Sequence, residues 1–380
     1  MKHFLTIFFL FAWLPLAYGQ GAKDAALPYG HGLSIPMAVT AVQTNAQLAL
    51  HKELLHHIVH EPIIQQIKTV TPTFSPPDMY GLLYFLYDYP FTYLVNPTSK
   101  TIKGTAVATL RHANVREAVI ASLQKRPLLE RYRALFDTQQ ATQKALQEAM
   151  NTLEKNTPSK YVPLQKTSSS GDDTPQKSVV EEIQTYANSL SALLGYQELL
   201  STYSYQWSSP QKAHTALTKL LALAPAAPII HGALAEVYYQ QNKPLQAQHH
   251  IAQALPHLTQ YAYIHDIHGL NLLQLELPSL ATDAFTAAIE RDGHTPRYYL
   301  HRATTFLARN KMASMCRDFK KACVLGDCSG SQWAYEQKLC LNEPSGKTDP
   351  TIAPAEPNEP LWPDKYPALE ERHEKKAASE

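Results

Sequence analysis

The sequence has few glycines, and none of them falls in a phosphate-binding motif. Only 14 of its 380 residues are glycine, and neither GxGxxG nor GxxxxGK[ST] occurs. Both motifs require glycine because backbone N–H groups must approach the phosphate oxygens closely. Nucleotide chemistry is therefore not expected. A GxSxG nucleophile motif is also absent, which argues against a serine hydrolase. We expect a protein without a cofactor that is not an enzyme.

The sequence also lacks an excess of either charge. It contains 34 Lys and Arg residues against 33 Asp and Glu residues. Residues 1–19 hold Lys2 and no acid, so their removal would leave 33 residues of each sign. Binding to nucleic acid needs a net basic surface, and attraction to anionic lipids needs basic clusters. Neither nucleic acid nor a charged membrane surface is an expected partner.

One apolar segment stands at the amino terminus. Lys2 precedes a mostly apolar run from Phe4 to Leu16, and Ala17-Tyr18-Gly19 follows it. This pattern predicts an export signal, residues 1–19, that is cleaved after Gly19. The run is too short to cross a bilayer, and no cysteine stands at the cleavage point to carry a lipid. We expect an exported protein, periplasmic or secreted, without a membrane span in its mature form.

A register of 34 residues runs from Leu194 to Ser329. Leu234-Ala235 is followed after 34 residues by His268-Gly269, and after 34 more by Arg302-Ala303. Three further sets share a position in this register: Tyr238, Leu272 and Phe306; Ile251, Phe285 and Phe319; Ala254, Ala288 and Ala322. A period of 34 with small residues at regular positions and large apolar residues nearby resembles the tetratricopeptide repeat family.

The resemblance implies helical hairpins in four units, 194–227, 228–261, 262–295 and 296–329, of which the first is atypical and acts as a cap. Ala235, Gly269 and Ala303 would lie where the two helices of a hairpin cross, and Ala247 and Ala281 would fill the matching position on the second helix. Phe285 and Phe319 would be buried between the helices. The turn position holds Asn242, Glu276 and Asn310, and asparagine tolerates the left-handed conformation that ends a helix.

Four cysteines, Cys316, Cys323, Cys328 and Cys340, lie close to the end of the repeats and allow three pairings. If 312–325 and 330–339 are antiparallel helices, Cys316 and Cys323 are separated by roughly 10 Å of helix rise, and Cys328 and Cys340 by roughly 18 Å. These pairs are too far apart for a disulfide, and so is Cys316 with Cys328. The remaining pairing is Cys316–Cys340 with Cys323–Cys328. A structural zinc site is the rival interpretation, although a CxxC pair is missing. The segment also resembles the carboxyl ends of bacterial tetratricopeptide proteins, which implies a bacterial origin.

The amino-terminal region, 20–157, has helical periodicity of its own. We predict helices at 37–68, 77–87, 115–125 and 127–155. Residues 158–175 contain Ser168 to Gly171, followed by Asp172, Asp173 and Pro175, and predict a flexible linker. The second domain would then span 176–340, ending in a capping helix at 330–339. The proline-rich tail, 341–380, is expected to be disordered.

Two groups in this region suggest binding. Aromatic residues cluster between Tyr80 and Tyr93, and they indicate either core packing under a loop or an exposed binding patch. His56 and His60 stand one helical turn apart and are weak candidates for metal ligands. The alternative is that His51, His56, His57 and His60 are surface histidines on a polar face.

For the repeats, the resemblance implies a concave groove that binds a partner. The positions that would line it are occupied by Glu198, Tyr205, Glu236, Tyr239, Gln240, Tyr263, Asp266, Leu270, Gln274, Arg297 and His301. The clamp of basic residues and asparagine by which family members hold a terminal carboxylate is missing, so an extended or helical peptide is the expected ligand. An apolar cluster in the tail, with Leu361, Trp362 and Tyr366, could dock into this groove.

We therefore expect an all-α protein. A separate helical region precedes a tetratricopeptide-type solenoid of helical hairpins, which a disulfide-stapled capping helix closes. The expected function is that of an exported scaffold or adaptor that binds a peptide or protein segment, for example in assembly of an envelope or secretion complex. The alternative is an enzyme or metal-binding module in residues 20–157 with the repeats as its docking arm.

Overall fold

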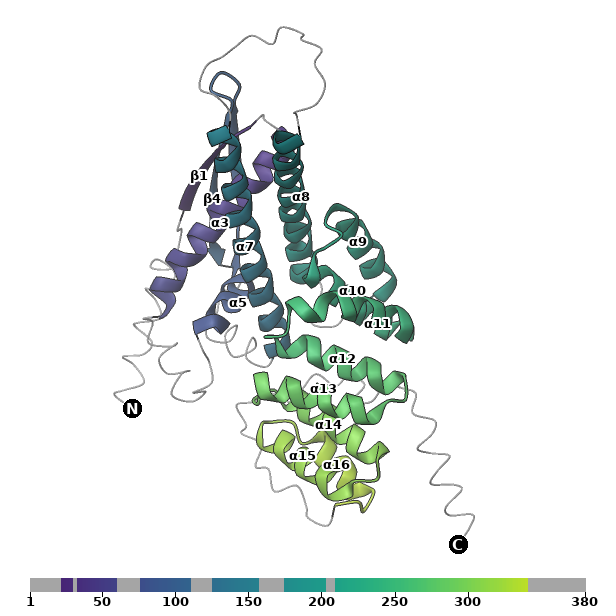
Figure 1. Cartoon of the computed structure of the whole chain (residues 1–380). Coiled ribbons are helices and arrows are strands. Elements are labelled where there is room, and N and C mark those ends of the chain that lie inside the picture. Colours follow the sequence, from purple (N-terminus) through teal and green to yellow (C-terminus); the bar gives the residue numbers. More distant parts are fainter. Residues whose placement is uncertain are drawn as a thin grey trace, which may run out of the picture. The chain divides into compact units, whose positions relative to one another are not determined.

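Helices make up most of the described chain (Figure 1). The computed structural model describes residues 22–29, 33–59, 76–110, 125–156, 174–202 and 209–340. Several predicted segments lie outside these ranges: the export signal, residues 158–173 of the linker, and the tail. Residues 115–124 of the helix predicted at 115–125 lie outside them as well, and so does Tyr205. The contacts divide the chain into two units, Met1–Ile230 and His231–Glu380. No helix in the described ranges combines the length and the apolar character needed to span a membrane.

The first unit contains a three-stranded antiparallel sheet. Its order is β1 (Ala22–Pro28), β4 (Thr101–Val107) and β3 (Phe91–Asn96). Alternate residues of β4 are buried, with Ile102 in one core with Ala38 and Val42 of the neighbouring helix. This alternation is typical of a strand with one buried face. The chain is mostly helical as predicted, but the prediction that its amino-terminal region is wholly helical is wrong here.

The described part of this unit also contains five helices and a short strand pair. They are α3 (Ile35–Val59), α5 (Pro76–Leu86), β2 (Tyr87–Asp88), β5 (Thr109–Leu110), α7 (Arg126–Asn156), α8 (Thr174–Thr202) and α9 (Pro210–Leu223). The predicted helices at 37–68, 77–87 and 127–155 correspond to α3, α5 and α7, although the described part of the first ends at Val59. The apolar side of α3 packs on β1 and β4 and on α8, and α8 also packs along α7. The start of the predicted second domain is therefore in contact with the amino-terminal helices.

The second unit is built from helices that follow one another at short intervals (Figure 1). They are α10 (Pro228–Gln240), which begins at the end of the first unit, α11 (Pro244–Ala254) with the 3-10 turn η1 (Leu255–His257), α12 (Ala262–Gln274), α13 (Pro278–Arg291), α14 (Pro296–Ala308), α15 (Met312–Val324) and α16 (Ser329–Glu336). Several of them begin with proline, whose fixed φ and missing N–H suit the first turn of a helix. The pairs α12 and α13, and α14 and α15, pack against each other.

The turns between paired helices repeat the same backbone geometry every 34 residues. Asn242, Glu276 and Asn310 have φ of 57°, 60° and 56°. In each turn the next residue donates its N–H to a carbonyl five residues back: Lys243 to Tyr238 at 2.9 Å, Leu277 to Leu272 at 2.9 Å, and Lys311 to Phe306 at 2.7 Å. This is the Schellman arrangement that satisfies the last carbonyls of a helix. The left-handed turn predicted for the two asparagines is confirmed, and Glu276 adopts it as well.

The small and large residues of the register meet as expected. A Cβ built on Gly269 would come within 2.5 Å of the Phe285 ring, so only glycine leaves room for that ring. Phe285 is fully buried, Phe319 is 1% exposed, and Ala235 and Ala303 are fully buried. The helices of each pair can therefore approach closely, because dense packing tolerates no additional volume.

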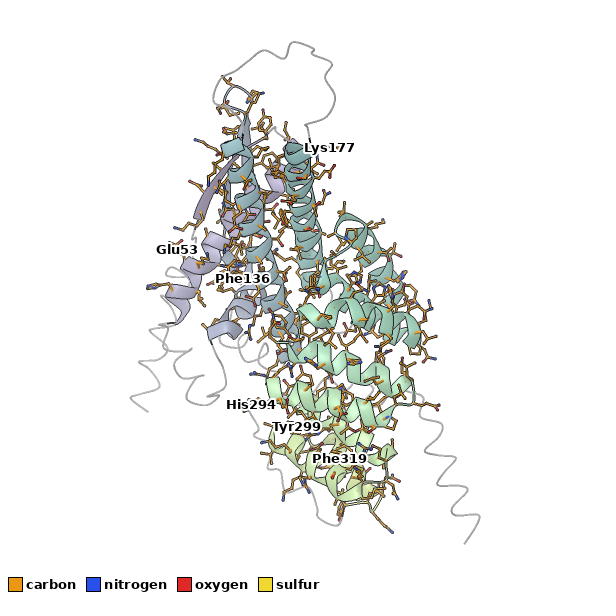
Figure 2. The ribbon with its side chains drawn as sticks, viewed as in Figure 1. Glu53, Phe136, Lys177, His294, Tyr299 and Phe319 are labelled. Carbon is orange, nitrogen blue, oxygen red and sulfur yellow. A yellow bond between two sulfur atoms is a disulfide. The ribbon has the colours of Figure 1, made fainter. Side chains whose placement is uncertain are left out.

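Both predicted disulfides are present at the end of the second unit. Cys316 bonds to Cys340 and Cys323 bonds to Cys328, with Cα–Cα separations of 5.8 and 3.9 Å. All four cysteines are therefore in disulfides, and none is left as a thiolate ligand for the zinc site considered above. Helix α16 packs on α15, where the rings of Phe319 (labelled in Figure 2) and Trp333 meet edge to face at 6.1 Å. The predicted helix at 330–339 corresponds to α16 and ends earlier, at Glu336.

Candidate functional site

A buried carboxylate lies among the residues predicted to line the groove. Asp266 of α12 is 2% exposed. Its Oδ1 lies 2.6 Å from Nδ1 of His301, and its Oδ2 lies 3.2 Å from Nε of Arg297, both on α14. Burial of a carboxylate is costly unless it is paired and hydrogen-bonded. The three side chains are therefore brought together, and they join α12 to α14 instead of leaving the acid open to a ligand.

Two glutamines occupy the same position of successive repeats. Gln240 ends α10 and Gln274 ends α12, and both are half-buried. Gln274 donates its Nε2 hydrogen to the carbonyl oxygen of Tyr239 at 3.1 Å. The Oε1 atoms of both glutamines are buried, and neither accepts a hydrogen bond from any described residue. Buried polar atoms are nearly always paired, so each of these carbonyl groups would gain a hydrogen bond from an N–H donor for which its side chain turns outward.

The other predicted lining residues differ in exposure. Glu236, Tyr263 and Leu270 are 4%, 3% and 7% exposed, so they present little surface. Glu198 is exposed and lies on α8 in the first unit. The half-buried members of the predicted set in the second unit have side-chain surface that a ligand can contact. They are Tyr239, Gln240, Gln274, Arg297 and His301.

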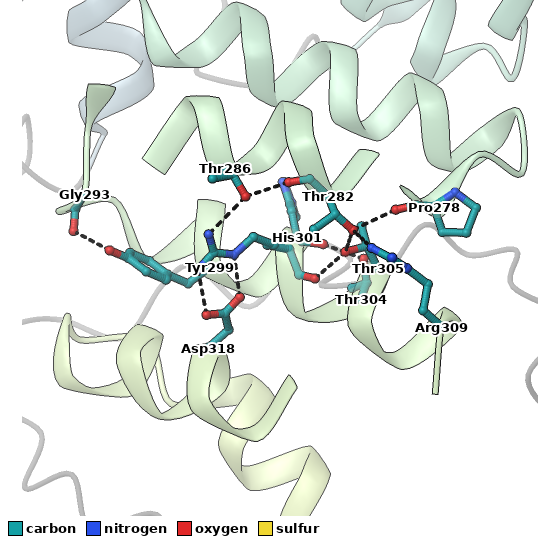
Figure 3. Close-up of polar contacts among 11 residues, drawn as sticks. Pro278, Thr282, Thr286, Gly293, Tyr299, His301, Thr304, Thr305, Arg309 and Asp318 are labelled. Carbon is teal, nitrogen blue, oxygen red and sulfur yellow. Dashed lines mark hydrogen bonds and ion pairs between the residues drawn. The ribbon is translucent and has the colours of Figure 1, made fainter. Parts of the chain in front are cut away.

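A guanidinium–carboxylate pair that the sequence does not reveal joins α14 to α15 in the second unit (Figure 3). Arg302 of α14 donates from Nε and Nη2 to the two carboxylate oxygens of Asp318 on α15, at 2.8 and 2.9 Å. Its Nη1 donates to Thr286 Oγ1 of α13 at 3.1 Å. The hydrogen bond with Asp318 raises the pKa of Arg302 above its ordinary value. Since these partners come from α13 and α15, Arg302 fixes the packing of three helices.

The histidines of α3 do not form one surface group. His56 is exposed and His60 lies outside the described residues, so the metal hypothesis on this pair stays a prediction. His51, taken above for a surface residue, is fully buried among the rings of Tyr84, Tyr89 and Phe136. Across the described ranges, no three His, Cys, Asp or Glu side chains gather closely enough to hold a metal ion.

The aromatic stretch is partly buried and partly exposed, and a binding role for its exposed part stays a prediction. Tyr84, Tyr87 and Tyr89 are buried, whereas Tyr93 and Leu94 on the edge strand β3 are 55% and 71% exposed. The buried tyrosines border a cavity of about 410 Å³ within the first unit. We call it the tyrosine cavity. Its remaining described lining residues are Asp88 of β2, Pro90, and residues of α3, α7, α8 and β5, and no local sequence pattern connects segments so far apart in the chain.

Comparison with known proteins gives no family assignment. No protein-family model matches the chain, and no curated protein matches it.

Proposed function

We propose that this chain is an exported, non-enzymatic scaffold of the tetratricopeptide type, which binds an extended peptide segment along its second unit. The observation that carries the proposal is the recurrence of one turn geometry at Asn242, Glu276 and Asn310. A regular succession of hairpins presents equivalent side chains at equivalent places, and repeat proteins use such surfaces to bind partners.

The chemistry of the surface favours a peptide ligand. Gln240 and Gln274 present the same amide group one repeat apart, each with an Oε1 that no described residue satisfies. An extended peptide carries backbone N–H groups at regular intervals and can donate to both. Asp266 is already paired with Arg297 and His301, so recognition would rest on amide and aromatic groups and less on charge.

The two disulfides support an oxidising compartment, because disulfides persist outside the cytosol and are rare within it. They join α15 to the turn before α16 and to Cys340, which follows α16. Export through the segment 1–19 would place the protein in such a compartment. A role in assembly of an envelope or secretion complex is consistent with that location.

The proposal can be tested by selecting binders from a displayed library of random peptides with the purified protein. The affinity of a selected peptide is then measured by fluorescence polarisation against Gln240→Ala, Gln274→Ala and Gln253→Ala. Each of the first two changes should weaken binding about three- to tenfold, the range of one or two hydrogen bonds. Gln253→Ala is the control, because Gln253 is exposed on α11 and the same chemical change there lies outside the proposed peptide-binding surface.

Two results would contradict the proposal. One is that Gln240→Ala and Gln274→Ala bind the selected peptides as tightly as Gln253→Ala does. The other is that the library yields no peptide that binds the second unit.

A further inference from the structure

The tyrosine cavity in the first unit has the size of a ligand site. Its volume of about 410 Å³ falls in the range of pockets that hold small organic molecules. Its walls come from segments between residues 43 and 201, all within the first unit. The cavity is therefore independent of the peptide surface proposed for the second unit.

The charged residues among the described lining of the cavity are both acidic. Asp88 and Glu198 are exposed residues of its wall, and none of the described lining residues is Lys, Arg or His. His51 lies behind Tyr84 and Tyr89, with ring centroids 4.3 and 4.5 Å from theirs. Burial lowers the pKa of His51 to about 3, so the ring is neutral and adds no positive charge. A ligand with positive charge would thus meet these two carboxylates and no cationic side chain among the described lining residues.

The interior of the wall offers aromatic rings and an unused acceptor. Tyr84 and Tyr132 stack with centroids 5.5 Å apart, and Tyr87 and Tyr89 lie beside them. Tyrosine rings attract cations through their negative faces. Gln47, 3% exposed, lines the cavity, and its buried Oε1 accepts no hydrogen bond from the described residues. A group that carries both positive charge and N–H donors would satisfy this atom.

We propose that the tyrosine cavity binds an organic ammonium group, a protonated primary amine on an apolar stem. Its stem lies against the tyrosine rings, its N–H groups donate to Gln47, and its charge faces Asp88 and Glu198. The same chemistry is presented by a free aliphatic amine and by the side chain of a lysine in a partner protein.

Isothermal titration of the full-length protein tests this with matched probes. Nα-acetyl-lysine-methylamide is compared with the norleucine analogue, which has the same stem and no charge, and cadaverine is compared with 1,5-pentanediol. Each amine should bind about tenfold or more tightly than its neutral partner, the range expected for a cation among aromatic rings. Tighter binding of cadaverine would identify the free amine as the ligand, and tighter binding of the lysine derivative the side chain.

Three variants assign the binding to this cavity. Glu198→Gln should weaken amine binding several-fold, whereas Glu182→Gln, which removes an exposed acid elsewhere on α8, should not. Gln47→Met keeps the shape of the side chain and removes the acceptor. It should weaken binding of the lysine derivative and leave binding of its Nε-trimethylated form unchanged, because the ammonium group of that form has no N–H to donate. A melting curve for each variant tests whether the fold is kept. Glu198 is exposed, so we expect its substitution to leave the core undisturbed.

The proposal is overturned if the norleucine analogue or the diol binds as tightly as its amine. It is also overturned if Glu198→Gln and Glu182→Gln have equal affinities for the amines.

Discussion

Phe285 lies directly against Gly269, so that an added Cβ on the glycine would meet the ring at 2.5 Å. Gly269→Ala should therefore destabilise the protein by about 1–3 kcal/mol, the cost of overpacking a dense interior. The loss should appear in urea unfolding followed by circular dichroism. It would occur even though alanine is the better helix former.

Gly232→Ala is the matched control for this change. Gly232 also lies within a helix, but the nearest atom to its added Cβ would be the flexible end of Ile264, at 3.3 Å, with Leu258 and Ala254 at the ordinary contact distances of 3.7 and 3.8 Å. We expect Gly232→Ala to be neutral or stabilising by up to about 1 kcal/mol. Equal effects of the two substitutions would contradict the packing argument.

Glu276 occupies a left-handed turn position that its neighbours fill with asparagine. With φ of 60° it has a conformation in which a side chain other than Asn or Asp is unfavourable. Glu276→Asn should raise the free energy of unfolding by about 0.5–1 kcal/mol, measured as a higher urea midpoint at unchanged slope. The converse change, Asn310→Glu, should lower it by a similar amount. A destabilised Glu276→Asn variant would show that this glutamate makes compensating contacts.

The stability contributed by the pair of Arg302 and Asp318 should depend on the shape of the guanidinium group as well as on its charge. Both side chains are largely buried, at 18% and 6% exposed, and two parallel hydrogen bonds join them. Arg302→Lys keeps the charge but cannot form both bonds or reach Thr286 as well, so we expect a loss of about 1.5–3 kcal/mol. The measurement is thermal or urea unfolding.

Lys144 and Glu148 provide the comparison on the surface. Their side chains are 77% and 66% exposed, with a separation of 3.8 Å. Because water screens exposed ion pairs, Lys144→Ala should change stability by no more than about 0.5 kcal/mol. If Arg302→Lys were equally mild, the buried pair would not determine the packing of α13, α14 and α15.

The second unit was predictable because its organising contacts are local. Gly269 and Phe285 are 16 residues apart in one hairpin. The 34-residue register predicts a small residue at the first position and a large apolar residue at the second. The disulfides followed from helix rise alone, since the geometry of two helices excludes the other pairings. Such relationships can be inferred without knowledge of the rest of the fold.

The first unit was less predictable because distant segments build it. Strand β1 pairs with β4 through partners such as Ala22 and Val107, which only the folded chain brings together. Helix α3 is buried on more than one side, so Gln47 and His51 are hidden although they are polar. A single apolar stripe cannot show a second buried face. The pairing of Asp266 with Arg297 and His301 was missed for a related reason, since a lining position in one repeat can be covered by the next.

His51 should make the stability of the first unit sensitive to acid. Burial lowers its pKa from 6.5 to about 3, and neither ring nitrogen has a hydrogen-bond partner among the described residues. As the pH falls below 6.5 the unfolded chain takes up a proton that the native state does not bind until about pH 3. In that window the contribution of His51 should lower the free energy of unfolding by up to about 1.4 kcal/mol per pH unit.

The test is the difference in unfolding free energy between the wild type and His51→Phe, measured from pH 7 to pH 4 by urea unfolding. Phenylalanine keeps the contacts with Tyr84 and Tyr89 and has no group to protonate, so the variant should lose less stability as the pH falls. His56→Gln removes an exposed histidine from the same helix and serves as the control. If His51→Phe and the wild type had the same pH dependence, His51 would not remain neutral in the native state, and the electrostatic argument for the tyrosine cavity would lose that support.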